Sequence, residues 1–88
     1  MSEEILQVEI ETNDGSKHTM NIKEVDSSEW DVIPIGTKGL ICLVNNEQLL
    51  VEINSADYDG ISFKYISDEK RSYYYEEEVI SNLYIEVL

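Results

Sequence analysis

The most unusual stretch of this sequence joins three tyrosines to three glutamates, Tyr73-Tyr74-Tyr75-Glu76-Glu77-Glu78. Tyrosine gives a large contact area at low entropic cost and is enriched at protein interfaces. Carboxylates beside such rings suit a partner rich in lysine or arginine. The candidate partner-binding residues are Trp30, Tyr73, Tyr74, Tyr75, Glu76, Glu77 and Glu78. The alternatives are a strand that packs one tyrosine face inward, and a tryptophan that belongs to the core.

Residue types that perform catalysis are sparse. His18 is the only histidine, so a structural zinc site is not expected. Cys42 is the only cysteine and lies in an apolar segment without a neighbouring cation, so we expect a buried, unreactive thiol. We therefore predict no catalytic residue, no cofactor and no metal site. An enzyme would require a deep pocket lined by His18 or by a carboxylate of raised pKa.

One acidic segment, Asp57-Tyr58-Asp59-Gly60, could be read as part of a calcium-binding loop. In an EF-hand register, however, Ile66 would occupy the position that needs a bidentate glutamate. Turns rich in Asp and Gly are common between strands. We therefore interpret this segment as a hairpin turn.

The charge of the chain restricts its partners. Nineteen acidic residues against 6 basic ones in 88 positions give a formal net charge of −13. Nucleic acids and anionic membranes are bound by positive surfaces, so neither is an expected partner. A basic protein is the expected partner, and acidity by itself can also serve solubility alone.

The N-terminal residues Met1-Ser2-Glu3-Glu4 lack the basic segment and apolar run of a signal peptide. No apolar run approaches the ~20 residues that span a bilayer. Together with the single cysteine, this predicts a reducing, cytoplasmic location without membrane association.

The residues that would position these side chains show a β pattern. Residues 5–11 alternate apolar and polar, which predicts a half-buried strand. The segment Asn13-Asp14-Gly15-Ser16 predicts a tight turn, and residues 17–22 return with a second alternation. Residues 1–23 therefore read as an N-terminal β-hairpin.

Residues 24–38 connect this hairpin to the rest. Ser27 or Ser28 could cap a short helix that Pro34 would end, and an irregular loop is the alternative. Residues 39–88 show a pattern of about four short strands with turns every 8–12 residues, typical of a sandwich or small barrel. One helical turn is expected within residues 76–82.

The second half resembles a known architecture. The segments Val44–Ile53, Asp59–Phe63 and Val79–Glu86 follow the strand order of Sm-like and related SH3-like small barrels, in which a short helical turn precedes the last strand. The resemblance covers about residues 40–88. It implies a barrel fold and, for Sm-like proteins, RNA binding through polar and basic loops. The corresponding turns here carry Asn45, Asn46, Glu47, Asp57 and Asp59, so the implied RNA binding is disfavoured.

The sequence thus predicts one all-β domain over residues 1–88, a small, mainly antiparallel barrel or strongly curved sheet of about six strands with one or two short helical turns. The predicted function is a non-enzymatic binding module for a basic protein partner. A sharper alternative is an acidic inhibitor, immunity-type or DNA-mimic protein that masks a nucleic-acid-binding protein. Self-association is a further alternative, by strand pairing along residues 83–88.

The charge generates a prediction about stability. If the carboxylates repel one another in the folded state, moderate sodium chloride screens them and raises the melting temperature by several degrees. Thermal denaturation followed by circular dichroism at increasing salt measures this. A melting temperature that stays constant or falls would contradict self-repulsion as a destabilising force.

Overall fold

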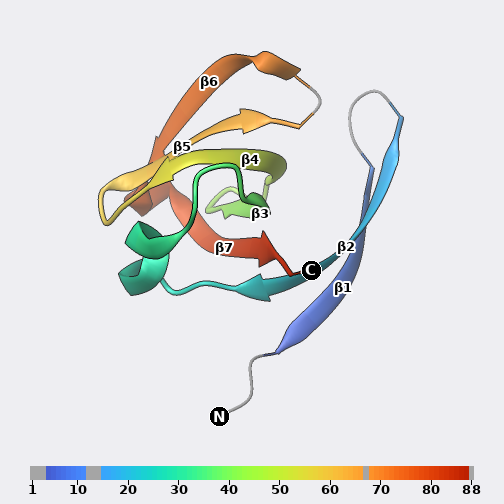
Figure 1. Ribbon diagram of the computed structural model, residues 1–88, viewed down its shortest axis with the longest axis horizontal. Helices are drawn as coiled ribbons and strands as arrows, with labels where there is room; N and C mark the ends of the chain where they lie inside the picture. Colours follow the sequence, from blue (N-terminus) through green and yellow to red (C-terminus); the bar gives the residue numbers. More distant parts are fainter. Residues whose placement is uncertain (1–3, 12–14, 67, 88) are drawn as a thin grey trace.

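The computed structural model describes residues 4–11, 15–66 and 68–87 of the chain (Figure 1). Within these ranges lie seven strands, β1 (Ile5–Glu11), β2 (Lys17–Glu24), β3 (Lys38–Leu43), β4 (Gln48–Ala56), β5 (Gly60–Tyr65), β6 (Asp68–Glu76) and β7 (Ile80–Glu86), and two 3₁₀-helices, η1 (Ser27–Val32) and η2 (Glu77–Val79). The described part holds no α-helix, so the all-β prediction is confirmed. None of its helices has the length and apolarity to cross a membrane.

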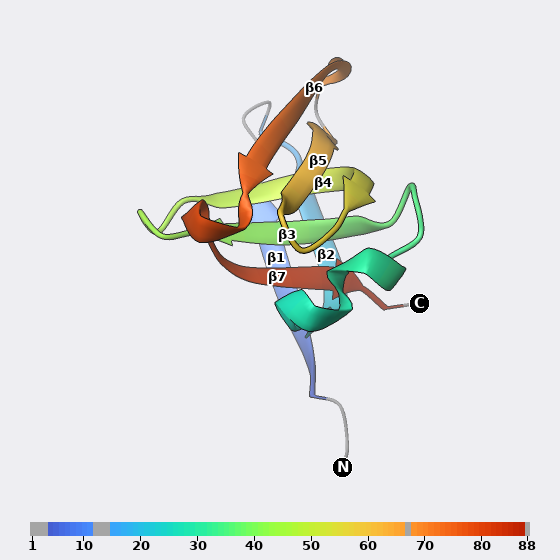
Figure 2. The ribbon, with the colours of Figure 1, turned by 90° about the vertical axis from the view of Figure 1, so that its left-hand side faces the viewer.

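All strands pair antiparallel in one open sheet of order β1-β2-β7-β3-β4-β5-β6. The sequence predicts about six strands, and the described residues contain seven, because five strands rather than about four follow residue 37. The sheet does not close into a barrel, since β1 and β6 form its two ends. Figures 1 and 2 show it curled; in Figure 2, β1 and β2 cross behind β3, β4 and β7.

The predicted hairpin of residues 1–23 is present, with β1 and β2 paired over the whole of β1 without a register shift. Asn13 and Asp14 of the expected turn lie outside the described residues, and Gly15 has a φ of +86°. β2 continues to Glu24 and pairs its last residues with β7. The hairpin is therefore part of the main sheet.

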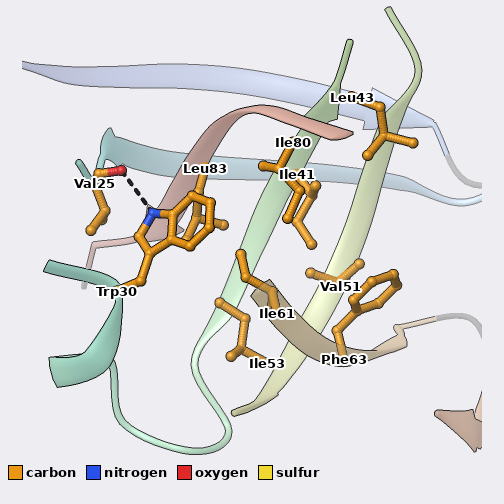
Figure 3. Packing of buried hydrophobic residues seen from close by; sticks show 10 residues of the cluster. All are labelled: Val25, Trp30, Ile41, Leu43, Val51, Ile53, Ile61, Phe63, Ile80 and Leu83. Atoms are coloured by element: carbon orange, nitrogen blue, oxygen red, sulfur yellow. Dashed lines mark hydrogen bonds between the residues drawn. The ribbon is translucent and has the colours of Figure 1, made fainter. Parts of the chain in front are cut away.

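Both faces of the central strands are buried. On one face Ile41, Val51 and Leu83 belong to the larger core cluster (Figure 3). On the other face Leu40 and Leu50 join Met20 and Ile22 of β2 in a second cluster. Two-sided burial explains why the sequence around Leu40 is apolar at successive positions rather than alternating.

The connecting segment forms η1, and its cap differs from the expected one. The Asp26 carboxylate, rather than Ser27 or Ser28, accepts a hydrogen bond from the Ser28 amide (3.1 Å). The Trp30 side chain is only 3% exposed, and its indole N–H donates to the Val25 carbonyl (3.2 Å) (Figure 3). This segment therefore closes one end of the larger cluster.

The edge proposed for self-association is not free. β7 pairs with β2 on one side and with β3 on the other, and the Val87 amide donates to the Asn21 carbonyl (2.7 Å). Leu88 lies outside the described residues. The prediction of pairing along residues 83–88 is wrong, because the N-terminal hairpin already occupies that edge.

A close backbone approach gives a stability prediction. A Cβ at Gly39 would overlap the Tyr84 carbonyl of β7, so Gly39→Ala must push two paired strands apart. We expect a loss of about 2 kcal/mol or more in the free energy of unfolding by urea denaturation. The control is Gly36→Ala, where φ is +90° but no atom lies near, with an expected loss of about 1 kcal/mol. Equal losses in the two variants would contradict the close approach.

Candidate functional site

The tyrosine strand alternates as its sequence predicts. Tyr73 and Tyr75 are half-buried on the inner face of β6 and pack against the larger core cluster. Their ring centroids lie 5.9 and 5.7 Å from that of Phe63. These two rings therefore belong to the wall of the core, while Tyr74 faces the opposite side.

Tyr74 is 53% exposed; it pairs with Ser62 of the neighbouring strand and its ring lies over Gly60. A Cβ at Gly60 would overlap the backbone carbonyl of Tyr75 and would stand 2.6 Å from the Tyr74 hydroxyl oxygen, so glycine leaves room for both the strand pairing and the ring. Partial desolvation, followed by the negative charges of Asp57, Asp59 and Glu76, raises the pKa of Tyr74 above its ordinary value of 10.0. The ring thus sits among carboxylates.

The turn between β4 and β5 supplies two of these carboxylates. Asp57 accepts hydrogen bonds on one oxygen from the amides of Asp59 (2.9 Å) and Gly60 (3.1 Å). The Glu77 amide donates to the Asp59 carbonyl (2.8 Å), which ties η2 to the turn. The segment is the expected hairpin turn, and among the described residues no group of three or more metal-ligating side chains forms a site.

A shallow hollow of about 430 Å³ lies between this turn and η2. Its lining consists of two tyrosines and four carboxylate residues: Tyr58, Asp59, Tyr74, Glu76, Glu77 and Glu78. Tyr58 is 63% exposed, and its hydroxyl donates to the Asp31 carboxylate of η1 (3.3 Å). That bond links the hollow to the connecting segment.

A second, smaller hollow of about 210 Å³ adjoins the first through their shared residue Glu77. It is lined in part by Glu24 and Asp26, and the Asn82 amide nitrogen donates to the Glu24 carboxylate (2.6 Å). Figure 2 shows that η1, η2 and the β4–β5 turn lie on one side of the molecule.

We call this side the acidic face. Its carboxylates line the two hollows or interact with Tyr58 and Tyr74: Glu24, Asp26, Asp31, Asp57, Asp59, Glu76, Glu77 and Glu78. The chain has no lysine or arginine within residues 24–37, 53–63 or 72–88, so the segments that build the face carry no cation.

The structure brings together only some of the predicted partner-binding residues. Tyr74 and the three glutamates line the first hollow, whereas Tyr73 and Tyr75 point inward. Trp30 is a core residue that lies beneath the second hollow with only 3% of its surface exposed, so it offers a partner little contact area, which corrects its assignment as a partner-binding residue. Tyr58 and Asp59 were missed, since only the pairing of β5 with β6 places their turn beside Tyr74.

The other chemistry-bearing residues lie away from this face. His18 is half-buried on β2 opposite Ile10, and neither hollow is lined by it. Cys42 is half-buried rather than fully buried. Burial, followed by the negative charge of Glu24, raises the pKa of its thiol, which disfavours the nucleophilic thiolate.

No protein-family model, no curated protein and no solved structure matches this chain. The functional argument therefore rests on the surface and its chemistry.

The environment of Tyr74 predicts a change in its titration. Glu76→Gln removes a neighbouring negative charge, which makes the phenolate easier to form, so the pKa of Tyr74 should fall towards 10.0. NMR titration of the ring carbon that bears the hydroxyl resolves this residue from the other tyrosines. Glu11→Gln, on β1, is the control and should leave the value unchanged. An unchanged pKa in Glu76→Gln would mean that this carboxylate does not act on the ring.

Proposed function

We propose that this protein is a non-enzymatic binding module that docks a basic protein partner on its acidic face. One observation carries the proposal: carboxylates from two separate segments, the β4–β5 turn and residues 76–78, surround a hollow that also exposes Tyr58 and Tyr74. Aromatic rings beside uncompensated carboxylates fit lysine and arginine side chains by charge and by cation–π contact.

The mechanism has two steps. The negative potential of the acidic face attracts a positively charged surface and raises the association rate. Burial of Tyr58 and Tyr74 in the complex then supplies apolar contact area and slows dissociation. The hydrogen bond from Tyr58 to Asp31 and the seating of Tyr74 on Gly60 support this step, because both hold a ring in place before the partner arrives.

The finer architecture forms part of the proposal. Strands β3 to β7, with η2 before the last strand, follow the order that suggested an SH3-like small barrel, and we propose that relationship for residues 39–88. The RNA binding implied by the Sm-like resemblance is not proposed, because the β4–β5 turn contributes carboxylates rather than cations. A reducing, cytoplasmic location remains part of the proposal, consistent with a half-buried free cysteine.

The test is affinity capture from native lysate at low salt with three forms of the chain. The wild type is compared with Glu76→Gln/Glu77→Gln/Glu78→Gln, which removes three charges from the acidic face. The matched control is Glu4→Gln/Glu9→Gln/Glu11→Gln, which removes three charges near β1. We expect a basic protein that wild type and control retain and the first variant loses, and that elutes at high salt because charge attraction is screened.

Two outcomes of this capture experiment would refine or contradict the proposal. A captured nucleic-acid-binding protein that DNA competes off the column would favour the DNA-mimic form of the proposal. Equal retention by both triple variants, or retention that high salt does not reverse, would contradict docking on the acidic face.

A further inference from the structure

Strand β1 is an end of the sheet that lacks several of the features that protect an edge. It is seven residues long, pairs with β2 without a register shift, and contains no proline or lysine; its charged residues are Glu9 and Glu11. Ile5 is 53% and Leu6 is 40% exposed. Long, regular, partly apolar edge strands are templates for pairing with another chain.

The other end of the sheet is better protected. The pairing of β5 with β6 shifts register between Phe63 and Tyr65, and β6 carries Lys70 and Arg71 beside this irregularity. Bulges and exposed cations are both devices that block edge pairing. An intermolecular strand is therefore favoured at β1 rather than at β6.

Hydrogen bonds of β2 show which backbone groups of β1 face outward. The Val25 amide donates to the Leu83 carbonyl (2.9 Å), and the Asn21 carbonyl accepts from Val87 (2.7 Å), so odd-numbered residues of β2 face β7. Because backbone groups alternate along a strand, even-numbered residues face β1. The register then turns the N–H and C=O groups of Ile5, Gln7, Glu9 and Glu11 away from the sheet.

We propose that the occupant of this edge is a second copy of the chain, paired antiparallel through β1 with Val8 on the two-fold axis. This register uses the whole strand and places Gln7 opposite Glu9, and Ile5 opposite Glu11, of the other copy. No two carboxylates stand directly opposite each other. Leu6 meets Ile10 of the second copy, so the apolar stripe of β1 continues across the interface.

The distribution of charge favours this edge for two negative chains. Figure 1 places β1 at the end of the molecule opposite η1 and the β4–β5 turn, so the acidic faces of two paired copies point apart. Two of the chain's 6 basic residues, Lys17 and Lys23, lie on β2 beside this edge. The Lys17 ammonium is 3.7 Å from the Glu9 carboxylate and offsets its charge. The acidic face stays open, so pairing is independent of the proposed partner.

The test is analytical ultracentrifugation of the full chain from 10 to about 500 µM, where a reversible interface of one strand pair is expected to form. The mass should rise from 10.2 kDa towards twice that value. Gln7→Pro removes an amide that faces outward and leaves the bonds to β2, so it should weaken dimerisation by about tenfold or more. Gln7→Ala keeps the amide and should dimerise like the wild type. A monomeric wild type at the highest concentration, or a Gln7→Pro variant that dimerises normally, would overturn the proposal.

The register is tested by cross-linking. With Val8 on the axis, two copies of Val8→Cys in a Cys42→Ala background bring their Cα atoms to ~4.5 Å, within disulfide range. Oxidation should give a covalent dimer. Leu6→Cys in the same background faces Ile10 and should give none. Equal cross-linking of both variants, or none in Val8→Cys, would refute this register.

Discussion

Burial of both faces of β3 and β4 is the constraint on which the rest of the structure depends. A chain of 88 residues has little apolar surface to bury, and these two strands use both of their faces. The inner face needs η1 and β5 to cover it, and the outer face needs β2. Each peripheral element is thereby fixed by an apolar side chain, such as Trp30 from η1 and Met20 from β2.

The same packing determines where the surfaces lie. Because Met20 and Ile22 must reach the outer face of β3 and β4, β2 crosses behind them and its end takes the free side of β7. The open edge is thereby moved to β1. Because Trp30 must reach the inner cluster, η1 lies beside the β4–β5 turn, where Asp31 meets Tyr58. The burial of Trp30 in the core thus positions Asp31 on the acidic face.

The alternation of apolar and polar residues made part of the fold and of the candidate site predictable from the sequence. It gave the all-β class, the first hairpin and the separation of Tyr74 from Tyr73 and Tyr75, since each depends only on period-two order within one strand. It could not give the cap at Asp26, the burial of Trp30 or the strand order, which depend on contacts between distant segments. Tyr58 joined the site only through the register of β5 on β6. The triple glutamate was found because it is continuous in sequence.

The placement of charge also follows from packing. Carboxylates cannot be buried without partners, and the described residues have no buried charged side chain. Of the segments that form the acidic face, η1 buries Trp30, whereas η2 and the β4–β5 turn bury no apolar side chain of their own and adjoin the buried Ile80 of β7 and Ile61 of β5. Repulsion among their carboxylates opposes this arrangement, so the apolar contacts of Trp30, Ile61 and Ile80 beneath them must exceed it. A cationic partner would reduce the repulsion among these carboxylates. The acidic face is therefore the part of the molecule that such a partner would stabilise most.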